Sequence, residues 1–196
     1  MKKTIFFLLI HSYLIYSGQL TMAYNMEIKA IYRGDFKNAR QVATMLGASH
    51  HGLDRQIDIY FKTINGGGRF KLRESSLSGS YLVPYIRPNQ QSAKESDYVL
   101  IRVDKKDVEK SKALFAQLYG IETVVKKMRD IYLYQNVRIH LDDVEGLGCF
   151  FELEVVYEEN NAENRAQAVT MVNFLMNQFG IEQKDLLSGS YHEMMQ

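Results

Sequence analysis

The chain has 196 residues, with 24 lysine and arginine residues against 23 aspartate and glutamate residues and a formal net charge of +1. This balance excludes a bulk electrostatic attraction to nucleic acid or to an acidic membrane, so any function driven by charge has to be local. A single cysteine, Cys149, excludes an intramolecular disulfide framework and a multi-cysteine zinc site. The length fits one domain with a proper hydrophobic core.

Residues 1–23 differ in composition from the rest of the chain. A basic start, a mostly apolar run and a small, polar stretch up to Ala23 form the layout of a secretory signal. The apolar run is shorter than the about 20 residues that span a bilayer. We therefore favour the absence of an integral membrane domain over a membrane anchor. The alternative is a spurious extension, with the natural start at Met22 or Met26. We expect a cytoplasmic protein in that case and an exported one if the signal works.

From residue 24 onward the apolar pattern switches repeatedly between period 2 and period 3.6, which indicates a single domain of mixed strands and helices at 24–196. Short alternating runs are separated by Gly, Ser and Asn, as between the strands of an antiparallel sheet. His50 and His51 fall in a loop between elements. In chain order we expect a strand at 24–33, a helix at 36–46, strands at 56–63, 66–74, 79–87 and 96–103, a helix at 107–119, strands at 123–134, 137–144 and 149–157, and a helix at about 162–179.

About eight mainly antiparallel strands are more sheet than a small open layer usually holds, and sheets of that size tend to curl and close. The three helices carry apolar stripes that need an apolar sheet face to cover. If the helices lie outside, the charged strand faces line a lumen; otherwise those faces are solvated surface. We favour the first arrangement. The sequence therefore predicts an α+β domain, a closed eight-stranded antiparallel β-barrel or tunnel with helices packed outside.

A lumen lined by charged side chains is costly unless a ligand or water satisfies them. Its natural guest is a polyanion, because Arg and Lys bind phosphate oxygens through charge-assisted hydrogen bonds. Carboxylates need a divalent cation to lie near the same phosphates, and Glu152 and Glu154 share one strand face that would complete a metal site with Glu27. Oxygen ligands favour Mg²⁺ or Mn²⁺ over zinc. His140, on the same predicted face, is a candidate for phosphate binding or proton relay.

The order of these segments resembles the CYTH family, the triphosphate tunnel metalloenzymes, and specifically its branch of class IV adenylyl cyclase-like proteins. The resemblance covers about residues 25–192, and it rests on six motifs in order at compatible spacing. It implies a closed eight-stranded tunnel that binds a triphosphate and one or two divalent metals. The motifs are "MEIKA", "DIYF", "RFKLRE", "YIRP", "VVKKMR" and "IHLDDVEGLGCFFELEV".

The resemblance also assigns roles to individual residues. The family signature E-x-E-x-K falls on Asn25, Glu27 and Lys29, so asparagine replaces the first glutamate and the number of metals stays open. Lys29 and His140 are the catalytic candidates. The implied metal ligands are Glu27, Asp142, Glu152 and Glu154. The implied triphosphate-binding residues are Lys29, Lys71, Arg73, Arg87, Lys127, Arg129 and Arg138.

The resemblance to the cyclase-like branch implies an adenylate cyclase, a phosphorus–oxygen lyase that converts ATP into cyclic AMP and pyrophosphate with Mg²⁺ or Mn²⁺. Two alternatives stay open. One is a triphosphatase acting on inorganic triphosphate or thiamine triphosphate, and the other is a non-catalytic module that binds nucleotides or polyphosphate. In each case we expect a small-molecule triphosphate and no nucleic acid as the partner, and a homodimer stays open.

Overall fold

The computed structural model describes residues 24–63, 68–86 and 92–196, with the side chains of residues 94–97 left out. Its strands are β1 (Tyr24–Ile31), β2 (Ser49–Phe61), β3 (Arg69–Ser75), β4 (Gly79–Ile86), β5 (Lys94–Tyr98), β6 (Ile101–Val103), β7 (Ile121–Tyr134), β8 (Val137–Val144) and β9 (Gly148–Tyr157). Its α-helices are α1 (Phe36–Met45), α2 (Val108–Tyr119), α3 (Ala162–Phe179) and α4 (Tyr191–Met194), and two short 3-10 turns lie at Lys105–Asp107 and Gln183–Asp185.

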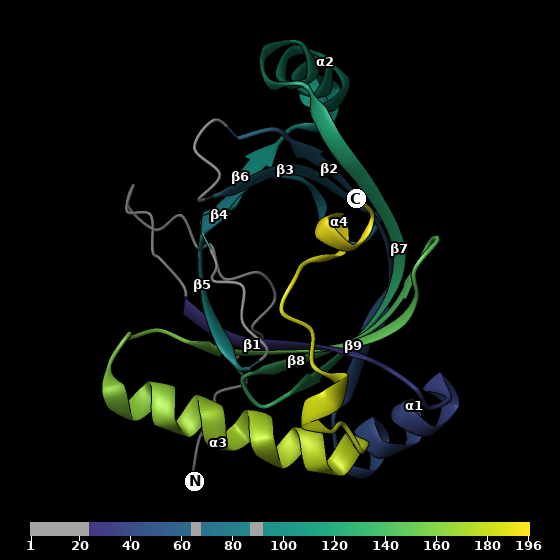
Figure 1. The fold of residues 1–196 in the computed structure, drawn as a ribbon, viewed down its shortest axis with the longest axis vertical. Coiled ribbons are helices and arrows are strands. Elements are labelled where there is room, and N and C mark those ends of the chain that lie inside the picture. The colour runs from purple at the N-terminus through teal and green to yellow at the C-terminus, as the bar shows by residue number, and fades with distance from the viewer. Residues whose placement is uncertain (1–23, 64–67, 87–91) are drawn as a thin grey trace, which may run out of the picture.

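The strands form one curled antiparallel sheet in the order β3-β2-β7-β8-β9-β1-β5-β4-β6. β3 also pairs with β4, so eight of the strands form a closed circuit of pairings. The ninth strand, β6, pairs with β4. Figure 1 shows α1 and α3 beneath the β1, β8 and β9 part of the sheet and α2 beyond its opposite side. The predicted arrangement, a curled antiparallel sheet of eight strands with helices outside, is confirmed.

The alternation of side chains along β1 and β9 decides what lies inside the curl. Glu27 pairs with Glu154 and Lys29 with Glu152 across these strands, so all four side chains share one face. The intervening residues, such as Leu153, point to the other face and belong to the hydrophobic core. A single-residue slip would move every charge into that core, so burial of the apolar face fixes the register.

The main core lies between the outer face of the sheet and helices α1 and α3. Asn161 caps α3 by accepting a hydrogen bond from the backbone N–H of Asn164 at 2.8 Å, and Gly180 ends the helix in the left-handed region. Helix α3 contributes buried side chains to this core, as do α1, the strands β1, β7, β8 and β9, and the segment after α3. A second core, around Ile59, Leu72 and Phe115, joins α2 to β2 and β3.

The structure differs from the predicted elements in three places. β2 begins at Ser49, so the prediction of a loop at His50 and His51 is wrong. Asp130 on β7 stabilises this extension, because its Oδ1 lies 2.7 Å from His50 Nε2. The strand predicted at 96–103 is divided into β5 and β6, and the polar C-terminal segment contains the unpredicted helix α4.

Truncating Leu153 should test how much the outer core stabilises the barrel. Leu153→Ala removes a side chain that is 0% exposed and leaves a cavity between the sheet and the helices. We expect it to lower the free energy of unfolding by about 2–5 kcal/mol, measured by urea denaturation. Leu118→Ala on α2, where Leu118 is 70% exposed, is the control and should change stability by less than about 0.5 kcal/mol. Equal losses in the two variants would contradict this assignment of the core.

Candidate functional site: a charged pocket inside the sheet

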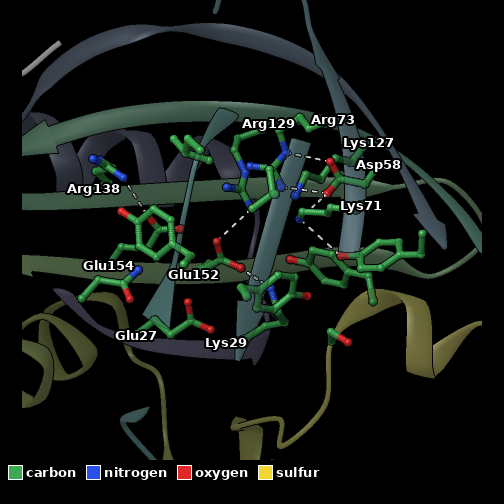
Figure 2. Close-up of a pocket in the computed structure, with 18 residues that line it drawn as sticks. Glu27, Lys29, Asp58, Lys71, Arg73, Lys127, Arg129, Arg138, Glu152 and Glu154 are labelled. Atoms are coloured by element: carbon green, nitrogen blue, oxygen red, sulfur yellow. Dashed lines mark hydrogen bonds and ion pairs between the residues drawn. The ribbon is translucent and has the colours of Figure 1, made fainter. Parts of the chain in front are cut away.

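A pocket lies inside the curl of the sheet, and its wall combines positive and negative side chains (Figure 2). They come from strands that are far apart in sequence but neighbours in the sheet, so the circuit of pairings brings them together. The predicted site residues that line this pocket are Glu27, Lys29, Lys71, Arg73, Lys127, Arg129, Arg138, Glu152 and Glu154.

Two predicted site residues do not line the pocket. His140 and Asp142 lie on β8, and both are buried, at 3% and 0% exposure. His140 Nδ1 lies 3.2 Å from Glu152 Oε1, so it contacts the pocket through that carboxylate. Arg87 lies outside the described residues.

The structure adds residues that the sequence analysis did not assign to the site. Asp58 and Tyr60 on β2 face the pocket, and the alternation of Ile57, Asp58 and Ile59 is the signal that could have identified them. The other added lining residues are Asn25, Val83, Tyr85, Tyr98, Leu100, Ser190 and Tyr191.

Arg129 on β7 holds the charged wall together. Its Nε and Nη2 donate to the two oxygens of Asp142, both at 2.6 Å, and Nη2 also donates to Glu152 Oε1 at 2.9 Å. Lys29 donates to the other oxygen of Glu152. Burial raises the pKa of Glu152, but Arg129 and Lys29 more than offset this and hold it well below its ordinary value. The carboxylate is therefore ionised at neutral pH.

A second group of charges lies on β2 and β3. Asp58 accepts two hydrogen bonds from Arg73, both at 2.7 Å, and one from Lys71 Nζ at 2.9 Å. Burial and the nearby Arg73 outweigh the attraction of Asp58 and lower the pKa of Lys71 to about 7. Burial and Arg129 likewise lower the pKa of Lys127 to about 8. An anionic ligand would favour the protonated form of both lysines, because its negative charge raises their pKa values and so opposes the effect of burial.

Figure 2 shows that both ends of the pocket carry positive and negative groups but in different proportions. Lys71, Arg73 and Lys127 lie with Asp58 at one end, whereas Arg138, Glu154 and Glu27 lie toward the other. Phosphate oxygens fit the first end, since its cations outnumber its single carboxylate. A cation fits the second.

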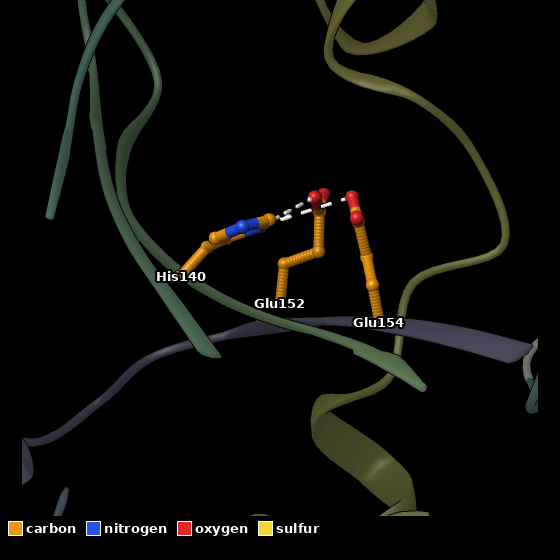
Figure 3. Close-up of side chains that lie close together, drawn as sticks. All are labelled: His140, Glu152 and Glu154. Atoms are coloured by element: carbon orange, nitrogen blue, oxygen red, sulfur yellow. Dashed lines mark hydrogen bonds and ion pairs between the residues drawn. The ribbon is translucent and has the colours of Figure 1, made fainter. Parts of the chain in front are cut away.

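The residues near Glu154 have the donor chemistry of a divalent-cation site. One donor atom each from His140, Glu152 and Glu154 lies within 4.8 Å of the others (Figure 3), and Glu27 faces Glu154 across the β1–β9 pair. Arg138 Nη1 donates to Glu154 Oε2 at 3.1 Å. Burial raises the pKa of Glu154, but His140 and Arg138 reverse this, and the resulting value lies below the ordinary one. Oxygen donors from Glu152 and Glu154, with His140 beside them, fit a divalent cation.

The C-terminal helix α4 lies inside the curl, where Figure 1 shows it beside β7. The Tyr191 hydroxyl donates to Asp142 Oδ2 at 2.8 Å, and Lys29 Nζ lies 3.8 Å from the centre of the Tyr191 ring. The neighbouring His192 stacks on Tyr60 with ring centroids 4.3 Å apart. Arg69 on β3 also reaches this helix by donating to Glu193 at 2.7 Å. The chain terminus thus forms part of the pocket wall.

Residues 23–191 match the CYTH domain family. The chain belongs to the CYTH family. This match covers the strands, the outer helices and the pocket, so the resemblance inferred from six motifs is confirmed. Membership of this family implies a small-molecule substrate and a divalent cation.

Proteins similar to this chain come from archaea and bacteria. A protein of Methanocaldococcus jannaschii named "Putative adenylate cyclase" is 29% identical over 145 residues, which cover 71% of this chain and 80% of that protein. A Pyrococcus horikoshii protein of known structure is 26% identical with a TM-score of 0.70, covering 86% of this chain and 98% of its own. A Vibrio parahaemolyticus structure, titled as a putative adenylate cyclase, has a TM-score of 0.70 at 17% identity, covering 88% and 97% of the two chains.

Among the described residues, no helix is both long and apolar enough to cross a membrane.

The lowered pKa values of Lys71 and Lys127 predict a pH dependence of anion binding. Both lysines must be protonated to attract phosphate, so the affinity for tripolyphosphate should fall as pH rises through about 7 to 8, and binding should take up protons there. Isothermal titration calorimetry in buffers of different ionisation enthalpy measures this uptake.

Lys71→Met should weaken tripolyphosphate binding and also reduce the proton uptake. Lys126→Met, which changes an exposed lysine on the outer face of β7, is the matched control and should leave both unchanged. Binding that strengthens with pH would contradict the assignment of these lysines to the anion site.

Proposed function

We propose that the protein is a divalent-cation-dependent enzyme that acts on a triphosphate in the pocket, and that it is an adenylate cyclase converting ATP into cyclic AMP and pyrophosphate. The observation that carries the proposal is the convergence of cationic side chains from β1, β3, β7 and β8 on one pocket that also holds a carboxylate set. Those cations are Lys29, Lys71, Arg73, Lys127, Arg129 and Arg138.

The cationic end would bind the two outer phosphates of the substrate. Lys71 and Lys127 have the lowered pKa values expected of ammonium groups that lack enough negative charge around them. Arg73 is held in place by Asp58 and offers a planar donor set to phosphate oxygens. In a cyclase reaction, the ribose 3′-oxygen bonds to the α-phosphorus and its proton passes to solvent, while the bond between the α-phosphorus and the oxygen that bridges it to the β-phosphorus breaks. The leaving pyrophosphate would then stay bound at this end.

The acidic end would hold the cation next to the α-phosphate. Glu27, Glu152 and Glu154 are the residues that would bind Mg²⁺ or Mn²⁺, which when bound neutralises phosphate charge during the displacement. Lys29 and His140 both contact Glu152, and so would fix the orientation of its carboxylate. Burial, with Arg129, lowers the pKa of His140, which favours a neutral ring beside the carboxylates.

Triphosphate hydrolysis is the second candidate. Cyclisation and hydrolysis share the positioning and neutralisation that this pocket offers, and they differ in which phosphorus atom is attacked. A Hippeastrum structure with the same fold, at 12% identity and a TM-score of 0.58, is titled as a putative adenylyl cyclase with a dominant triphosphatase activity. The fold therefore accommodates this alternative.

Product analysis separates the candidates. Purified protein incubated with ATP and either Mg²⁺ or Mn²⁺ should yield cyclic AMP and pyrophosphate, resolved by anion-exchange chromatography. Orthophosphate and ADP would instead identify a triphosphatase, and tight ATP binding with no product would identify a binding module. If ATP, thiamine triphosphate and tripolyphosphate all remain unconverted, the proposal that the protein is an enzyme is wrong.

Glu154 offers a test of the acidic end. Glu154→Gln keeps the size of the side chain but removes the charge that a cation needs, so we expect cation-dependent activity to fall by roughly 10²-fold and Mn²⁺ affinity to fall with it. Glu158→Gln, at an exposed position just beyond β9, is the matched control. Wild-type Mn²⁺ binding in Glu154→Gln, followed by electron paramagnetic resonance, would remove Glu154 from the cation site.

A further inference from the structure

One wall of the pocket is apolar, in contrast to the charged walls on β7, β8 and β9. Val83 on β4, Tyr98 at the end of β5 and Leu100 between β5 and β6 all line the pocket. Backbone pairing holds these segments side by side, since Tyr85 pairs with Tyr98 and the N–H of Val99 donates to the carbonyl of Pro84 at 3.2 Å. The three side chains therefore contribute apolar atoms to the same side of the pocket.

Asn25 extends this side of the pocket onto the neighbouring strand β1. The backbone of Asn25 pairs with that of Ser96 on β5. Tyr98 lies two residues after Ser96, so it is on the same face of the sheet as Asn25. The Asn25 side chain lines the pocket at 4% exposure, and its Oδ1 has no hydrogen-bond partner among the described residues. A buried acceptor without a donor is costly, so a donor on a bound ligand would stabilise it.

These features do not suit an inorganic phosphate chain. Phosphate oxygens and a cation gain nothing from the Val83 and Leu100 side chains, and an anion has no donor to offer Asn25 Oδ1. An organic group with a flat apolar body and a hydrogen-bond donor suits both features, because it packs against the apolar residues and donates a hydrogen bond to Asn25 Oδ1.

We infer that Asn25, Val83, Tyr98 and Leu100 hold the nucleoside of a nucleoside triphosphate, with Asn25 as a specificity-determining residue. This rests on the proposed binding of a triphosphate at the charged walls. The nucleoside lies against β4 and β5, and its phosphates extend toward Lys71, Arg73 and Lys127. A nucleoside supplies both an apolar face and N–H or O–H donors, whereas tripolyphosphate supplies neither.

Isothermal titration calorimetry with Ca²⁺ can compare ATP, GTP, CTP and UTP with tripolyphosphate, which presents the same anion without a nucleoside. We expect at least one nucleotide to bind wild type about tenfold more tightly than tripolyphosphate. Asn25→Leu should weaken that nucleotide about fivefold, as expected for one lost hydrogen bond, and leave tripolyphosphate within about twofold. Asn173→Leu, at an exposed position on α3, is the matched control.

Leu100→Ala is a second, independent variant in case Asn25→Leu does not fold, which circular dichroism and Tm would show. It should also weaken the nucleotide selectively. Tripolyphosphate binding as tightly as all four nucleotides would overturn the nucleoside subsite. An equal loss of nucleotide and tripolyphosphate in Asn25→Leu would overturn the role of Asn25 and place it at the cation or phosphates. If no triphosphate binds wild type at all, the proposed function itself fails.

Discussion

The ion pairs centred on Arg129 are the constraint on which the pocket depends. Its guanidinium bridges Asp142 on β8 and Glu152 on β9, so one side chain sets the relative positions of carboxylates on two strands. Charges buried this deeply are tolerated only when each has a partner of opposite sign and good hydrogen-bond geometry. A pair of this kind adds little net stability, but losing one partner is expensive because the other charge stays buried. The buried carboxylates and cations inside the sheet thus balance one another.

This internal pairing also prepares the site for a polyanion. Asp58 and Glu152 hold cations in place while a ligand is absent, so a triphosphate meets donors that need little reorganisation. The lowered pKa of Lys71 indicates that the pairing is incomplete at the cationic end. The pocket is therefore preorganised in geometry but still short of negative charge, which is the balance that favours binding of a phosphate chain.

Much of this arrangement could be predicted from the sequence, because it follows from period-2 alternation. In these strands every second residue packs against the outer helices, so the residues between them point into the pocket. The inward residues found in this way are Glu27, Lys29, Lys127, Glu152 and Glu154. What could not be predicted is which charge pairs with which. Asp142 stays a predicted metal ligand, and its contacts with Arg129 and Tyr191 could not be read from the sequence. Such contacts depend on barrel stagger and on a short polar helix, and neither leaves a periodic signal.

The pairing of β1 has a consequence for how the chain folds. The first described strand lies between β9 and β5, so Ile28 pairs with Leu153 near the far end of the domain. β1 cannot reach its place in the sheet until β9 exists, and the pairing must close a loop that spans most of the chain. The contacts that complete the pocket are therefore among the most distant in sequence, and high contact order slows folding. The edge of β1 that faces β9 therefore stays unpaired until residues 148–157 have been synthesised, although its other edge can pair with β5 earlier.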